Sequence, residues 1–250
     1  GDRFSRFTGK SEPDGFGDAP GDFAGASDVN GQLTALHPFY YRDAMRQGAV
    51  DLMAMVYLLQ EGDLSGLADV DSSLAGTTFD TTHLGFVGTD LGGEIGVAAA
   101  SAESGLATLV LAFTGGLSVD GWIDSPASQP LVDALITRLG RVPDMVDVEV
   151  DSPLLWPDLD AWRALADRGT ALAYAPSLRR SPANIFMLMA RDDETVHNRS
   201  TEALGFALGA SLVGGEPKHV PDLGTDQFPP NETLSGNFDV EGVAATRILY

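Results

Sequence analysis

Residues 84–96, LGFVGTDLGGEIG, limit how this chain can fold more than any other stretch. An apolar run of strand length ends in GTDLG at residues 88–92, and an Ala-rich segment of helical character follows at once. Glycines on both sides of a charged residue permit a sharp turn in which two backbones approach closely. The stretch therefore predicts a strand, a tight turn and a helix in direct succession.

Further apolar runs extend this pattern to a fold class. Runs of about strand length occupy His83–Val87, Leu106–Phe113 and Asn184–Ala190. Such near-continuous runs are typical of a parallel sheet covered on both faces. A helical segment follows the first of these runs, at Glu94–Ala102, and another follows the third, from Asn198 to a stop at Gly209. The alternation predicts an α/β fold with a doubly wound, mostly parallel sheet.

The remaining sequence suggests two additions to this sheet. Residues 1–40 are rich in Gly, Asp, Pro and Ser and predict an irregular N-terminal arm, which leaves 41–250 for the α/β domain. That domain should begin with an amphipathic helix whose buried positions are Ala44, Met45, Ala49, Leu52, Met53, Val56 and Leu59. Residues 115–182, with several Pro breaks, predict a cap-like insertion. Its tryptophans, for which core packing is expected, are Trp122, Trp156 and Trp162.

The charge balance excludes some partners. Thirty-six acidic against fifteen basic residues give a net charge of −21, which argues against nucleic acid and anionic membrane surfaces. No apolar run approaches the roughly 18 residues of a membrane span. The absence of cysteine removes disulfides and thiolate chemistry. Such acidity fits an extracellular or cell-surface setting, and it also fits a need for solubility alone.

An acidic loop precedes the first strand and offers oxygen ligands for a structural calcium ion, at Asp63, Asp69, Asp71 and Asp80. Their spacing does not match an EF-hand loop, so a solvated loop is the stronger expectation and no other cofactor is expected. Two N-glycosylation sequons begin at Asn198 and Asn231, a tripeptide that is common by chance.

The turn at 88–92 has the layout of a nucleophile elbow, G-x-S-x-G, with Asp90 in place of serine. In that motif the nucleophile sits on a strained turn at a helix N-terminus. Gly88 and Gly92 are then the small neighbours that the turn needs, and Gly93 helps the helix pack. The N–H of Leu91 would be one donor of an oxyanion hole.

HLGFVGTDLGGEIGVAAAS resembles the elbow of α/β-hydrolases. RDAMRQGAVDLMAMVYLL upstream and ARDDETVHNRSTEALGFALG downstream resemble extracellular bacterial lipases of the virulence-factor type. The resemblance covers roughly residues 41–114 and 184–215. It implies a lipase or esterase fold in which Asp90 takes the nucleophile position and Asp193 the acid position, with Asp192 as the rival acid.

The histidine of such a triad should follow the acid in chain order. His219 is the best candidate for this base, and an ordinary surface-loop histidine is an equal alternative. His197 lies too close to the acid and should face solvent or cap a helix. His37 and His83 precede the elbow and are poor candidates.

Asp90 has three interpretations. In the first, the serine has been lost by evolution or engineering, and the chain is a disarmed hydrolase that binds an acyl or apolar ligand or acts as a structural subunit. In the second, Asp90 is a carboxylate nucleophile, as in the G-x-D-x-G-G elbows of haloalkane dehalogenases and epoxide hydrolases, which it resembles. In the third, Asp90 only caps the helix. We expect the first.

A complete fold of this type has further strands before the elbow, and residues 1–40 contain neither these nor an early oxyanion turn. The terminal ATRILY is also typical of a strand. The sequence therefore predicts an incomplete sheet, to be completed by a partner chain or by a further segment of a larger protein.

Overall fold

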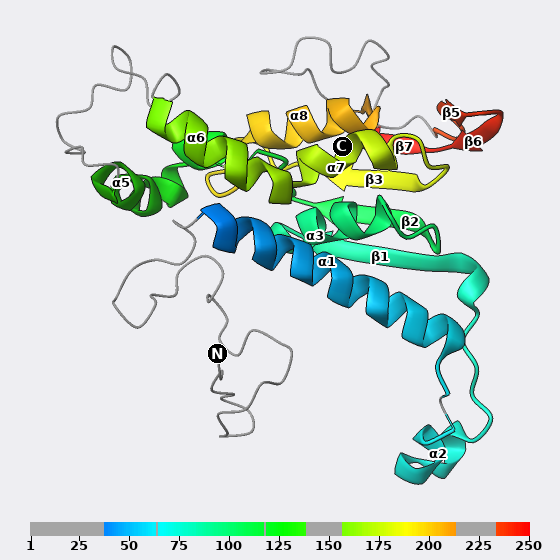
Figure 1. The fold of residues 1–250 in the computed structure, drawn as a ribbon. Helices are drawn as coiled ribbons and strands as arrows, with labels where there is room; N and C mark the ends of the chain where they lie inside the picture. Colours follow the sequence, from blue (N-terminus) through cyan, green and yellow to red (C-terminus); the bar gives the residue numbers. More distant parts are fainter. Residues whose placement is uncertain (1–37, 64, 118, 139–156, 214–233) are drawn as a thin grey trace. The chain divides into compact units, whose positions relative to one another are not determined.

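The computed structural model describes residues 38–63, 65–117, 119–138, 157–213 and 234–250 (Figure 1). The described chain divides into two compact units, one containing 1–44 and 130–169 and the other containing 45–129 and 170–250. The predicted arm at 1–40 lies almost wholly outside the described residues. No helix of the described part is both long and apolar enough to cross a membrane.

The larger unit contains the sheet. Its strands are β1 (Leu84–Thr89), β2 (Leu106–Ala112), β3 (Asn184–Leu188), β4 (Ser211–Leu212) and β7 (Arg247–Leu249), in the order β1-β2-β3-β7-β4. Every neighbouring pair in this sheet is parallel. A separate antiparallel hairpin joins β5 (Phe238–Val240) to β6 (Val243–Ala245). The predicted α/β class with a mostly parallel sheet is confirmed, and ATRILY contains the strand β7.

The helices of the described chain alternate with these strands. They are α1 (Pro38–Glu61), α2 (Leu67–Val70), α3 (Leu91–Ala100), α4 (Val119–Ile123), α5 (Gln129–Arg138), α6 (Pro157–Ala166), α7 (Ala171–Leu178) and α8 (Asn198–Leu208), with short 3₁₀ turns at Ser72–Leu74, Thr81–His83, Pro126–Ser128 and Asp167–Gly169. Gly209 ends α8 in the left-handed conformation, φ 74°, as predicted.

One face of the sheet packs against helices α1, α3, α7 and α8. The core on this face joins residues such as Val56, Val97, Leu178 and Leu204 to strand residues Leu109, Leu111, Ile185, Met187 and Leu249. The α1 positions predicted to be buried are all buried or half-buried, whereas Val50, Tyr57 and Leu58 on its other side are exposed. The 3.6-residue period thus predicted the packed face of α1 correctly.

The other face of the sheet carries an apolar row, formed by Val87, Val110, Phe186 and Ile248, which are direct register partners. Val87 is 72% exposed and Phe186 36%. Helices α1, α3, α7 and α8 therefore cover one face of a sheet whose strands are apolar on both. This explains why the strands read as continuous apolar runs rather than as alternating ones.

The smaller unit is helical where it is described. Within it, Tyr41 at the start of α1 packs against Trp162 of α6, with ring centroids 6.3 Å apart. Trp162 is buried, so core packing holds for this tryptophan. Trp156 lies outside the described residues. The predicted insertion at 115–182 contains α4 to α7, and α7 packs within the sheet unit.

Candidate active site

The elbow of the sequence is an elbow in the structure. Asp90 is the single residue between β1 and α3, and its backbone has φ 50° and ψ −125°. A residue with a side chain rarely adopts a positive φ, and such strain costs about 1–3 kcal/mol and clusters at functional sites. The backbone N–H of Asp90 donates to the carbonyl of Ala112 on β2 (3.1 Å), which fixes the turn to the neighbouring strand.

Two glycines make this turn possible. A Cβ on Gly88 would lie 2.8 Å from both the Gly92 carbonyl oxygen and the Gly93 Cα, and a Cβ on Gly93 would overlap the Thr114 hydroxyl. A Cβ on Gly92 would meet no described atom within 4 Å. The prediction that Gly92 must be small was therefore wrong, because the close approach is made by Gly88 and Gly93.

The carboxyl of Asp90 is exposed to solvent on one side. Partial burial of its other side raises the pKa, a hydrogen bond from the N–H of Leu91 lowers it, and the charge of Asp193 raises it; the net pKa lies above the usual value. Asp90 stands at the N-cap position of α3 but makes no capping hydrogen bond. N-cap residues also have an extended backbone, unlike Asp90. The interpretation of Asp90 as an ordinary cap is therefore wrong.

Asp193 lies in the loop after β3. Its Oδ1 accepts hydrogen bonds from the N–H groups of Thr195 (2.8 Å) and Val196 (3.0 Å). Its own N–H donates to Asn198, whose amide donates to the Ala190 carbonyl (2.6 Å). The loop thus holds the Asp193 carboxylate in a fixed place, from which its charge acts on Asp90.

The rival acid Asp192 adjoins Asp193 and has a positive φ of 52°. Asn198, the start of one sequon, is buried and its amide is engaged, so it serves the loop rather than a glycan. The structure brings Asp90 and Asp193 to the same edge of the sheet, because both follow the carboxyl ends of parallel strands.

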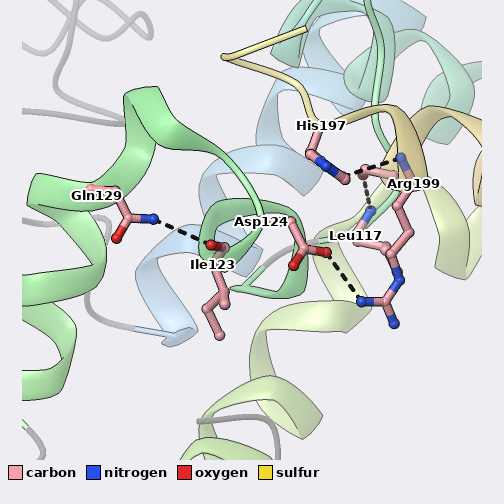
Figure 2. Close-up of polar contacts among 7 residues, drawn as sticks. Leu117, Ile123, Asp124, Gln129, His197 and Arg199 are labelled. Atoms are coloured by element: carbon pink, nitrogen blue, oxygen red, sulfur yellow. Dashed lines mark hydrogen bonds and ion pairs between the residues drawn. The ribbon is translucent and has the colours of Figure 1, made fainter. Parts of the chain in front are cut away.

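The candidate base His219 lies outside the described residues, as do His37 and Asn231. His197 is the N-cap of α8, and its Nδ1 accepts the N–H of Arg199 (3.3 Å; Figure 2). This agrees with the prediction that His197 caps a helix. The Nδ1 of His83 lies 3.6 Å from the Oδ2 of Asp80, at the exposed segment just before β1.

The segment after β2 is fixed by contacts that the sequence did not predict (Figure 2). The buried Ser200 hydroxyl accepts the N–H groups of Gly116 and Leu117, each at 2.9 Å. Beside it, Arg199 pairs with Asp124, the residue after α4 (3.1 Å). Since Thr114 in this segment also packs against Gly93, Ser200 anchors a wall of the elbow. A serine among the polar residues that begin α8, NRSTE, gave no signal of this role.

Glu94 is a second residue missed by the sequence reasoning. It lies one turn after Asp90 on α3, is 5% exposed, and its Oε2 accepts the N–H of Ala171 at the start of α7 (3.3 Å). Burial raises the pKa of Glu94 to about 8, opposed by the Ala171 N–H and supported by the charge of Asp90. The available signal was an acid inside the otherwise apolar run LGGEIGVAAA.

Three of the four acids considered for calcium serve their own turns. The carboxylates of Asp63, Asp71 and Asp80 accept N–H groups two residues ahead, from Ser65, Ser73 and Thr82. Asp80 also accepts the Thr82 hydroxyl, which is the largest cause of its lowered pKa, and the N–H groups lower the pKa of all three acids. Among the residues that the structure describes, no group of three or more His, Asp or Glu could hold a metal ion.

A cavity of about 370 Å³ adjoins this loop, and it is lined by Leu59, Gln60, Gly62, Asp63, Ser65, Gly76, Thr77, Thr78, Phe79 and Thr81. None of the elbow residues lines this cavity. The strained backbone of Asp90 and the charge of Asp193 that acts on it, rather than the cavity, therefore mark the candidate active site.

No protein-family model matches the chain, and no curated protein does. Among solved structures, it is similar to an acylaminoacyl peptidase of Pyrococcus horikoshii, with 12% identity, a TM-score of 0.39 and coverage of 76% of this chain and 24% of that one. It is also similar to a puromycin-hydrolyzing peptidase of Mycobacterium tuberculosis, with 14% identity, a TM-score of 0.36 and coverage of 76% and 23%. The chain spans about a quarter of the length of these structures.

Proposed function

We propose that this chain is an α/β-hydrolase-type scaffold, of the extracellular lipase-like kind, in which Asp90 disarms the serine-type reaction. It would act as a binding or structural subunit for a small acyl or apolar ligand, with a partner chain or further segment completing the sheet. The observation that carries this proposal is the backbone of Asp90, which has the strained turn of a nucleophile between β1 and α3.

Electrostatics supports the disarmed state. Acyl transfer needs N–H donors that stabilise a developing oxyanion. At this elbow the Asp90 carboxylate stands close enough to the N–H of Leu91 for that group to lower its pKa, and Asp193 contributes a further negative charge. An oxyanion formed here would meet like charge instead of free donors. Attack by the carboxylate on an ester carbonyl would also give an anhydride, which is a poor acyl intermediate.

A carboxylate nucleophile remains the second candidate, because the Asp90 side chain is exposed and set in the strained conformation. Ionised Asp90 would displace a leaving group from saturated carbon to form an ester. His219, held in orientation by Asp193, would then activate a water molecule that hydrolyses this ester. The raised pKa of Asp90 implies that this activity would fall at acidic pH, as the nucleophile becomes protonated.

Hydrolysis of short-chain and long-chain p-nitrophenyl esters by the wild-type chain and by Asp90→Ser tests the proposal. We expect turnover only with Asp90→Ser, since the serine restores the nucleophile and removes a charge beside Leu91. A matched control is Asp192→Ser, which replaces the acid next to Asp193 that also has a positive φ. This variant should show no turnover. Ester turnover by the wild-type chain that Asp90→Asn abolishes would contradict the disarmed state.

The second candidate has its own measurement. A single turnover of a haloalkane or epoxide in H₂¹⁸O places ¹⁸O in the Asp90 carboxylate if that group forms the ester. Mass spectrometry of the peptide that contains residue 90 reads this out. If the label is absent and Asp90→Ser also shows no esterase activity, neither reaction takes place at the elbow. The chain would then be a binding or assembly subunit.

A further inference from the structure

Glu94 is buried at the point where two helices meet the elbow. It belongs to the first turn of α3, and its backbone N–H donates to the carbonyl of Asp90 (3.3 Å). Its side chain leaves α3 and reaches the N-terminus of α7, where it accepts the N–H of Ala171. The two contacts, one from the backbone and one from the side chain of Glu94, connect the strained residue, the elbow helix and a second helix.

The chemistry of this contact favours the neutral acid. A helix N-terminus stabilises an anion by about 0.3–1 kcal/mol, or up to about 2 kcal/mol when partly buried. Removing a carboxylate from water without a full set of partners costs more than that. One N–H donor is therefore insufficient, and the neutral form can accept from Ala171 with one oxygen while its hydroxyl carries the proton.

We propose that Glu94 is the positioning residue of the elbow: as a neutral acid it holds the first turn of α3 against the N-terminus of α7, and thereby sets the direction and the electrostatic field of Asp90. The role rests on the proposed function of Asp90. Ionisation of Glu94 would place a second negative charge one helical turn from Asp90, weakening the affinity of the elbow for any anion.

The two carboxyl groups should then titrate as a coupled pair. Of the charged groups around Glu94, the one whose field acts on it is Asp90, on the same helix, while α7 contributes the Ala171 N–H. Asp193 acts on Asp90 but is not among the groups that act on Glu94. Asp193→Asn is therefore a matched control for Asp90→Asn.

Carbon-13 NMR of side-chain carboxyl groups, in a chain labelled at Asp and Glu, measures both titrations without any substrate. In the wild type we expect Glu94 to titrate near pH 8 and the Asp90 signal to show a second inflection at the same pH. In Asp90→Asn the Glu94 midpoint should move to lower pH, whereas in Asp193→Asn it should stay. In Glu94→Gln the second inflection of Asp90 should vanish.

A Glu94 midpoint near 4.5, or one that is identical in the wild type and Asp90→Asn, would overturn the proposal. The Asp90→Asn and Asp193→Asn variants keep the test valid even if Glu94→Gln fails to fold. Because no ester or ligand is used, failure here is distinct from failure of the proposed function.

Discussion

The two ends of α7 are each held by a buried ionisable side chain, and the two side chains differ in how many partners they have. At the N-terminus, Glu94 accepts the single N–H of Ala171. At the C-terminus, Arg247 of β7 donates to the carbonyls of Leu178 (3.2 Å), Ser181 (2.6 Å) and Leu208 (2.6 Å), the last of which ends α8.

The number of partners decides whether the charge survives burial. The Arg247 guanidinium also lies over the Phe238 ring, 3.9 Å from its centroid. Burial, with a smaller contribution from Arg179, lowers the pKa of Arg247 to about 10, so it remains charged at neutral pH. Glu94, with one donor, has a pKa of about 8 and is mostly neutral there. The backbone groups at a helix end can thus find a hydrogen-bond partner in an ion or in a neutral acid. Only the acid can change its charge near neutral pH.

Removing the C-terminal contact should have the largest effect. Arg247→Met nearly keeps the volume but takes the guanidinium donors from the carbonyls of Ser181 and Leu208, at about 1–3 kcal/mol each, whereas the Leu178 carbonyl keeps the N–H and the hydroxyl of Ser181. We expect a loss of several kcal/mol in the free energy of unfolding, measured in urea. The control Arg180→Met alters an exposed arginine on the same turn and should change stability by no more than about 0.5 kcal/mol. Equal effects of the two would refute the role of Arg247.

The N-terminal contact should show itself in pH dependence. A carboxyl whose pKa rises from 4.5 to about 8 on folding destabilises the native state as pH rises between these values, by up to about 1.4 kcal/mol per pH unit. Below 4.5 the effect is absent, because both states are protonated. Glu94→Gln should flatten this slope and be the more stable protein at pH 7, as followed by thermal unfolding.

Glu61→Gln, at an exposed acid that ends α1, is the control for this slope. It should retain the wild-type pH dependence. Arg247 adds no slope between pH 5 and 8, since its pKa of about 10 lies above that window. A wild-type slope that survives in Glu94→Gln would place the responsible group elsewhere.

The smallest effects should come from the two glycines of the elbow helix, which test how tightly its end is held. Gly93→Ala should destabilise by about 1–3 kcal/mol, because its Cβ would overlap Thr114. Gly92→Ala meets open space at an ordinary φ and should stabilise by about 0.5–1 kcal/mol through its helix propensity. Urea unfolding gives the free energy of unfolding of both variants. A loss of stability in Gly92→Ala would mean that the added methyl group clashes with another part of the protein.

Sequence patterns predicted the parts of this molecule that depend on local order. The buried side of α1, the strands β1, β2 and β3, and the elbow follow from the spacing of apolar residues and glycines. Glu94 and Arg247 could not be assigned in this way, because their partners lie 77 and 69 residues away in Ala171 and Leu178. Within their own segments each looked like a single charge in an apolar run.

The interior position of β7 has a consequence for the order in which the fold forms. β7 lies between β3 and β4, and β4 pairs only with β7 in the described sheet. Thr246 contacts Asn184 across 62 residues of chain, which a ribosome adds in roughly 3–12 s at about 5–20 residues per second. Throughout that interval β3 is an open edge on the nascent chain, able to pair with any extended segment nearby. Until Arg247 has been synthesised, the carbonyls at the ends of α7 and α8 likewise lack the hydrogen bonds that it donates.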